Sequence, residues 1–289
     1  MILLKNNKRI VYSIFILIFS VIFISGYESF DYEFLKKKEE PKKLLNSKKD
    51  SKKQNTFENL IKGFTKKEGL LNYYWNKDQN KCFLVIDKKQ LNQTFILSLT
   101  RSTGDAYRYH GSAMMYEFLF SLKRVGSNIQ MIAENVKFRA NQDSVIFKAI
   151  NNNITQSIFS SAKIQAFSEK DSLILIDASQ LFIFDFPRIS NRGKYILDKN
   201  NSYFDKINSF ETNSELDMVF HYKGKKPDYV YTLPNSSSML HRYHLSISKL
   251  PNNSYKPRVF DDRVGHFDII YQDYSEMLTE SPYKRYITR

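Results

Sequence analysis

Residues 70–100 read LLNYYWNKDQNKCFLVIDKKQLNQTFILSLT and contain three short apolar runs separated by polar segments. The runs are Leu70 to Trp75, Cys82 to Asp87 and Phe95 to Thr100. Aromatic and β-branched residues favour strands, and the polar segments between the runs suit the turns of an antiparallel meander. This stretch therefore predicts a β-rich fold.

The same pattern continues along the chain, which has 23 Phe and 19 Tyr but only 9 Gly. With 289 residues and 42% hydrophobic content, the chain can bury a substantial core. No period of 20 to 50 residues recurs, which disfavours solenoids and propellers. We predict an α+β fold, mainly antiparallel β, with short strands in one or two packed sheets and a few short helices. Further strands are expected at Tyr116–Val125 and Ile129–Phe138, which Gly126-Ser127-Asn128 would join as a hairpin, and at Ala162–Phe167, Leu173–Ile176, Leu216–Tyr222, Tyr229–Leu233, Leu240–Ile247 and Phe267–Tyr271.

Three segments favour or permit helices. Residues 57–64 form a short amphipathic pattern, with Thr56 as N-cap and an end near Gly63. Between 144 and 160, apolar residues recur every three to four positions, which predicts a second helix. Residues 181–186, which precede Pro187, fit either a buried strand or a short helix, and the sequence leaves this choice open.

The first residues have the layout of an export signal. Lys5, Lys8 and Arg9 precede residues 10–24, which carry no charge, and Ser25-Gly26 follows with small side chains. This order predicts a signal peptide at residues 1–26. The apolar run is shorter than the ~20 residues that a transmembrane helix needs, so cleavage is favoured over an uncleaved membrane anchor, and both over a buried helix. Either of the first two options places the protein in the periplasm or cell envelope.

Residues 27–55 are expected to form a lysine-rich, disordered linker ahead of a β-rich domain at residues 56–289. Between 36 and 53 there are nine lysines against three acidic residues, and the segment has almost no aromatic or β-branched side chain. The chain as a whole has a formal net charge of +14. The lysines are not interleaved with aromatic residues that could stack on bases, so nucleic-acid binding is not expected. Contact with a membrane surface is the alternative to a solvated spacer.

Cysteine and histidine patterns argue against a metal or catalytic centre in this chain. The single cysteine, Cys82, has no partner for an internal disulfide, and its apolar neighbours predict a buried, inert thiol. His241 and His244 would point to opposite sides of a strand, so they could not hold one ion together. Asp261 and Asp262 are interpreted as turn residues beside arginines. No nucleophile or phosphate-binding motif occurs, so we assign no catalytic, cofactor-binding or metal-binding residue.

A stretch near the end of the sequence resembles a known family. The stretch reads Tyr255-Lys256-Pro257-Arg258-Val259-Phe260-Asp261-Asp262-Arg263-Val264-Gly265-His266-Phe267. It resembles the end of the N-terminal, non-catalytic region of large bacterial zinc-dependent metalloproteases, whose catalytic domain carries a His-Glu-x-x-His helix further downstream. The residues that carry the likeness, as structural or docking residues, are Tyr255, Pro257, Arg258, Phe260, Asp261, Arg263, Gly265 and Phe267. Weaker similarities lie at residues 69–74, 193–202, 244–251, 273–274 and 285–287, whereas residues 105–115 depart from the pattern expected in relatives.

The resemblance implies an exported, non-catalytic accessory domain, in a split or truncated form, that supports or covers a separately encoded His-Glu-x-x-His domain. Zinc would then belong to that partner. The alternative is a stand-alone exported β-domain that binds peptide or glycan in an aromatic groove with Tyr73, Tyr74 and Trp75, although these residues are more readily interpreted as core. Enzymatic activity of this chain alone is the least favoured hypothesis.

Overall fold

The computed structural model describes residues 56–107, 109–169, 172–190, 194–252, 255–275 and 282–287. These residues belong to one compact unit, Lys53–Arg289. The signal peptide or anchor expected at 1–26 and the linker expected at 27–55 lie outside the described residues.

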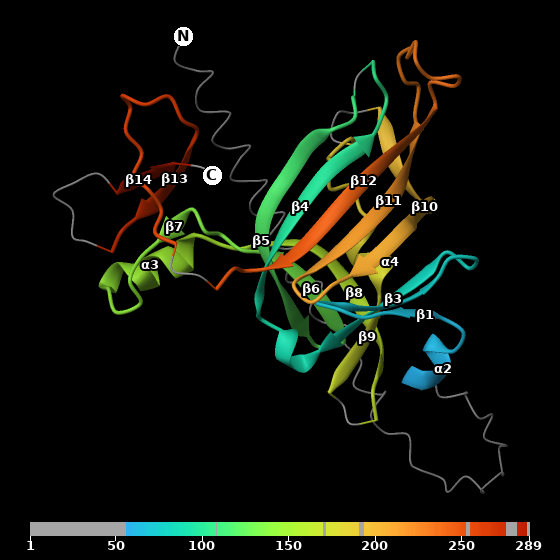
Figure 1. Ribbon diagram of the computed structural model, residues 1–289, viewed down its shortest axis with the longest axis horizontal. Coiled ribbons are helices and arrows are strands. Elements are labelled where there is room, and N and C mark those ends of the chain that lie inside the picture. Colours follow the sequence, from blue (N-terminus) through green and yellow to red (C-terminus); the bar gives the residue numbers. More distant parts are fainter. Residues whose placement is uncertain are drawn as a thin grey trace, which may run out of the picture. The chain divides into compact units, whose positions relative to one another are not determined.

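Most of the unit is one antiparallel sheet of eleven strands that curls around its own core (Figure 1). The strand order is β1-β2-β3-β9-β8-β6-β5-β4-β12-β11-β10. The bounds are β1 Thr65–Lys67, β2 Asn72–Asn76, β3 Lys81–Asp87, β4 Thr94–Thr103, β5 Ala113–Val125, β6 Asn128–Ala133, β8 Ser157–Phe167, β9 Leu173–Asp177, β10 Tyr195–Ser209, β11 Asn213–Gly224 and β12 Ser238–Lys249.

The curl brings the start of β2 against the end of β10 and the start of β11. The backbone nitrogen of Leu70 donates to the carbonyl of Phe210 at 2.6 Å, and the Ser209 hydroxyl donates to the carbonyl of Leu71 at 2.7 Å. The backbone nitrogen of Leu71 donates to the Ser214 hydroxyl at 3.3 Å. We call this contact between residues 69–71 and 209–214 the seam of the curled sheet.

The core fills the inside of the curl, and β3 shows how the sequence specifies it. Cys82, Leu84 and Ile86 face the main core, whereas Phe83 and Val85 face a second, smaller cluster. Helix α2, Phe57–Ile61, contributes Phe57 to the second cluster. A strand that is covered on both faces must be apolar at successive positions, which explains the unbroken run that marks β3 in the sequence.

Short helices complete the fold. Helix α4, Ala178–Phe182, follows β9 and buries Ala178, Leu181 and Phe182 in the main core. The 3₁₀ helix η2, Lys88–Gln90, connects β3 to β4 and carries a capping box between Asp87 and Gln90. No helix among the described residues is long and apolar enough to cross a membrane.

A second, small sheet has the order β14-β13-β7. It consists of β7 Phe138–Arg139, β13 Asp268–Asp273 and β14 Tyr283–Ile287. The β13–β14 pair is antiparallel, and β7 pairs with β13 in parallel. Helix α3, Val145–Asn153, follows β7 along the chain.

The mainly antiparallel β fold with few short helices is confirmed, as are most expected strands. The hairpin between β5 and β6 is also confirmed, with Val125 opposite Asn128 and Gly126 at φ +58°. Residues 181–186 belong in part to α4, which settles the open choice in favour of a helix that ends at Phe182.

Four expectations were wrong. Strands are longer than expected, up to the 15 residues of β10, which was not predicted as a strand. The helix expected at 144–160 ends at Asn153. Ile158, which fitted the helical spacing of apolar residues, belongs to β8 instead. The segment expected as one strand at 129–138 divides into β6 and β7. Residues 229–233 form a turn in which the Leu233 nitrogen donates to the Val230 carbonyl.

Candidate functional site

The terminal motif, residues 255–267, pairs with the small sheet along the outer edge of β14. Val259 forms an antiparallel bridge with Tyr286. The Phe260 nitrogen donates to the Arg285 carbonyl at 3.0 Å, and the Ile287 nitrogen donates to the Arg258 carbonyl at 3.0 Å. The motif is therefore joined to β14 by backbone pairing as well as by side chains.

The side chain of Arg285 connects the motif to the small sheet through hydrogen bonds and a ring contact. Its guanidinium donates to Asp262 at 2.8 Å and to Asp268 at 2.6 Å, and it lies 4.0 Å from the centroid of the Phe260 ring. Hydrogen bonds to Asp268 and Asp262 raise the pKa of Arg285. Asp262 thus serves as an ion-pair partner of Arg285.

Asp261 and Arg263 form a second, local ion pair in the same turn. The Arg263 guanidinium Nε donates to both carboxylate oxygens of Asp261, at 2.9 and 3.1 Å, and its backbone nitrogen donates to Oδ1. These hydrogen bonds hold the pKa of Asp261 below its usual value. Exposed pairs of this kind contribute ~0–1 kcal/mol, so the pair shapes the turn more than it stabilises the fold.

Aromatic contacts connect the three strands of the small sheet. The rings of Tyr271 on β13 and Tyr286 on β14 stack with centroids 5.3 Å apart and an interplanar angle of 3°. The Arg139 guanidinium on β7 lies 3.9 Å from the Tyr271 ring centroid. Desolvation, together with a hydrogen bond to Tyr286, raises the pKa of Tyr271 to about 12.

The small sheet nevertheless has no buried core of its own among the described residues. Among the described residues of 133–157 and 255–287, which include β7, α3, β13 and β14, none is buried. Ile269 and Ile270 are adjacent on β13 and exposed by 57% and 49%, so each face of the strand presents an exposed isoleucine. The other exposed large apolar residues of the terminal segment are Tyr255, Val259, Val264, Phe267 and Tyr283. We call these seven residues the apolar surface of the small sheet.

Two further motif residues, Gly265 and Phe267, lie on the surface. A Cβ atom built on Gly265 would meet nothing within 4 Å. Phe267 is 87% exposed, although it is a large aromatic residue. Tyr255 and Pro257 also lie on the surface. Contacts within this fold thus involve the side chains of Phe260, Asp261 and Arg263, whereas Gly265 and Phe267 belong to no buried cluster of the described residues.

A buried polar network lies in the curled sheet, away from the motif. His241 Nδ1 lies 3.0 Å from the Tyr243 hydroxyl, and the Tyr222 hydroxyl donates to Asp185 at 3.1 Å. Arg101 is also buried and lies 5.9 Å from the Tyr243 ring centroid. Burial, together with the positive charge of Arg101, lowers the pKa of His241 to about 4. Sequence reasoning missed Arg101, although it continues the alternation of the buried residues Phe95, Leu97 and Leu99 along β4.

His241 and His244 point to opposite sides of β12, as predicted. His241 is fully buried with Tyr243 and Leu245 in the main core. On the other side, His244 Nδ1 lies 2.6 Å from Asp217 and Nε2 lies 2.8 Å from Glu215. Each ring nitrogen already has a carboxylate partner. The described part of the chain contains no group of three or more His, Cys, Asp or Glu side chains placed to hold a metal ion.

Tyr73 cannot take part in the aromatic groove considered at residues 73–75, whereas Tyr74 and Trp75 are half-buried. Tyr73 is fully buried in the main core, and Trp75 packs against the same core. Tyr74 packs against the smaller cluster with Phe83. Cys82 is buried as predicted, and burial raises the pKa of its thiol well above the usual value.

Comparison with known proteins identifies the family. Residues 112–289, which are 178 of the 289 residues, match the domain of unknown function DUF5117. The chain therefore belongs to the DUF5117 family. The match includes the terminal motif and the whole small sheet. No curated protein and no solved structure matches the chain.

Proposed function

We propose that this chain supplies a non-catalytic accessory domain of an exported zinc-dependent metallopeptidase, and that this domain supports or covers the catalytic domain. The apolar surface of the small sheet would be the docking surface. The His-Glu-x-x-His helix and the zinc ion would belong to the partner. The assignment of this chain to the peptidase family rests on the resemblance of residues 255–267.

The observation that carries the proposal is the absence of buried residues in the small sheet among those described. A sheet of three short strands needs a covered hydrophobic face to be stable in water. Here isoleucines are exposed on both faces of β13, and Phe267 and Val259 are exposed by 87% and 73%. Large exposed apolar side chains that gather on one element are typical of protein interaction sites, and here each face of β13 presents one. A partner that covers this surface would supply the burial that the chain lacks.

The motif residues are consistent with the same role. Arg285 and the backbone pairing with β14 fix the position of the motif, whereas Phe267 is 87% exposed and a Cβ atom on Gly265 would meet nothing within 4 Å. Residues that are part of a family motif but not of a core are better explained by a contact outside the domain. In this proposal Phe267 is an anchor residue, and the absence of a side chain at Gly265 permits close approach of the partner.

The proposal includes location in the periplasm or cell envelope, which rests on the signal-like order of residues 1–26. The alternative is a stand-alone exported domain that binds peptide or glycan. Its aromatic groove loses Tyr73 to the core, so it would need a different site.

The test is a binding measurement between the full chain and a purified His-Glu-x-x-His domain from the peptidase family that the motif resembles. We expect a one-to-one complex by size-exclusion chromatography with light scattering. Ile270→Asp should weaken the complex at least tenfold, because it places a charge within the apolar surface. Leu240→Asp is the matched control, since Leu240 is 60% exposed on β12 of the other sheet. No complex with catalytic domains of the family, or equal weakening by both variants, would refute the proposal.

A further inference from the structure

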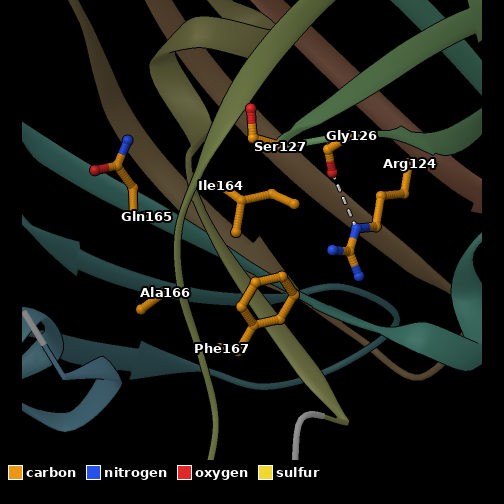
Figure 2. Close-up of a pocket in the computed structure, with 7 residues that line it drawn as sticks. All are labelled: Arg124, Gly126, Ser127, Ile164, Gln165, Ala166 and Phe167. Atoms are coloured by element: carbon orange, nitrogen blue, oxygen red, sulfur yellow. Dashed lines mark hydrogen bonds between the residues drawn. The ribbon is translucent and has the colours of Figure 1, made fainter. Parts of the chain in front are cut away.

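A pocket of about 490 Å³ lies where the β5–β6 hairpin meets the far end of β8 (Figure 2). It is separate from the small sheet and its motif. Its lining residues are Arg124, Gly126, Ser127, Ile164, Gln165, Ala166 and Phe167.

Arg124 brings a charge to the end of the core face of β5. Phe120 and Leu122 are fully buried in the main core. Because side chains alternate along a strand, Arg124 is on the same side of β5 as these two residues. The pocket thus lies at an open end of the inner face of the curled sheet, and the mouths of curled or closed sheets are common ligand sites.

A β-bulge in β8 positions the apolar side chains that line the pocket. Ile164 pairs with Ile176 and Ala166 with Leu175, so Gln165 is an extra residue in β8. Beyond such a bulge the alternation shifts by one residue. Ile164 and Phe167 accordingly pack against the main core, while Ala166 packs against the smaller cluster. The shift places the Phe167 ring centroid 4.8 Å from the Arg124 guanidinium.

Arg124 is held in place without a carboxylate partner. Its Nε donates to the Gly126 carbonyl at 3.2 Å, as Figure 2 shows, and the Phe167 ring lies beside the guanidinium. Among the residues that the structure describes, no ion pair with Arg124 is found. A guanidinium fixed through Nε still presents its two Nη groups, which match a carboxylate in a bidentate manner.

Among the residues that the structure describes, none pairs with residues 165–167 of β8 on the side opposite β9. The pairing of β6 with β8 ends at Asn128 opposite Lys163, and the Ile164 nitrogen then donates to the Ser127 carbonyl at 2.9 Å. Residues 165–167 continue as a strand, and β9 is their strand partner on the other side. An open strand edge is a template for an added extended segment.

We propose that this pocket binds an extended peptide that carries a carboxylate. The peptide backbone pairs with residues 165–167 of β8. An apolar peptide side chain contacts Ile164 and Phe167, and the carboxylate binds Arg124. The open strand edge selects a peptide, and the unpaired guanidinium selects an acidic one.

The test uses the full chain and fluorescence anisotropy with two libraries of labelled, C-amidated five-residue peptides. In both libraries Val alternates with a varied residue; one library carries a single Glu, and the other carries Gln in its place. We expect micromolar to submillimolar binding for members of the Glu library, and at least tenfold weaker binding for the paired Gln peptides. Arg124→Gln should weaken the tightest peptides at least tenfold, and Arg124→Lys less, because Lys keeps the charge but not the bidentate geometry.

Arg139→Gln is the matched control. Arg139 also donates through Nε to a backbone carbonyl, that of Val136, at 3.2 Å, and also lies beside a ring, that of Tyr271. The Arg139→Gln variant should bind the peptides with an affinity within twofold of the parent chain. Methylation of the peptide backbone nitrogens at alternate positions should abolish binding in one of the two registers. Equal affinity of Glu and Gln peptides, no binding up to millimolar concentration, or no effect of methylation in either register would overturn the proposal. Displacement of the peptides by octanoate at equal affinity would also overturn it, in favour of a small apolar carboxylate.

Discussion

A Cβ atom built on Gly69 would lie 2.5 Å from the backbone nitrogen of Phe210. The two residues meet at the seam of the curled sheet, one position before the hydrogen bond from Leu70 to the Phe210 carbonyl. Backbone cannot retreat as a flexible side chain can, so this approach requires glycine.

Gly69→Ala should therefore destabilise the fold. Overpacking of a tight site typically costs ~1–3 kcal/mol, and we expect a loss in this range. Urea denaturation followed by the fluorescence of Trp75, the single tryptophan, measures it. Gly265→Ala is the control, because a Cβ there meets nothing within 4 Å, and its stability should stay within about 0.5 kcal/mol of the parent chain. Equal stability of the two variants would contradict the close approach at the seam.

His241 should make stability depend on pH in a defined window. Its pKa is lowered from 6.5 to about 4, so the unfolded chain takes up a proton below pH 6.5 that the folded chain excludes until about pH 4. The unfolded state then binds more protons, and stability is lost as pH falls through this window, by about 3 kcal/mol in total. Denaturation at a series of pH values should show this slope in the parent chain and in His266→Gln, whose histidine is exposed. A slope of the same size in His241→Gln would assign it to other groups.

The Cys82 thiol should resist modification in the folded chain. Burial raises its pKa and disfavours the thiolate, which is the reactive form. At pH 8, a thiol-reactive chromogenic disulfide should label the native chain only as fast as it opens, and should label one thiol rapidly in concentrated urea. Rapid stoichiometric labelling without denaturant would show that the thiol is accessible.

Arg285→Ala should loosen the terminal motif without unfolding the curled sheet. It removes two ion pairs and the contact with the Phe260 ring, which are weak at exposed sites and together hold the motif in place. Hydrogen exchange of the Phe260 amide, which donates to the Arg285 carbonyl, should accelerate about fivefold or more. In Arg263→Ala the exchange at Phe260 should change less, since the pair with Asp261 is local to the turn. The reverse order of effects would contradict the role given to Arg285.

The sequence predicts strands where burial leaves a strong periodic signal. β3 is apolar at successive positions because both faces are covered, and β12 alternates because one face is covered. β10 was missed because it is an edge strand with register shifts, and its middle carries Asp198, Lys199 and Asn200. Solvent on one side and bulges within the strand remove the alternation on which such a prediction depends.

The residues of the candidate sites also differ in how far the sequence alone could have predicted them. The motif residues were found in the sequence, but the contact of Arg285 with Phe260 depends on the pairing of β14 with the motif, which no local pattern encodes. Arg124 could have been suspected, since it continues the alternation of Phe120 and Leu122. Arg101 could have been suspected for the same reason, since it continues the alternation of buried residues along β4. Its contacts with Tyr109 and Tyr243 could not, because the first lies in a loop and the second on β12.

The seam also has a consequence for how the chain folds. Leu71 and Ser214, which it joins, are 143 residues apart, so the curl cannot close until most of the domain has been synthesised. Contacts of such long range slow folding, and until they form, β1 and β10 remain as two unprotected edges. During biogenesis the protein would therefore be most prone to aggregation just before the edge strands β1 and β10 come together. A chaperone that shields either edge would help it most at that moment.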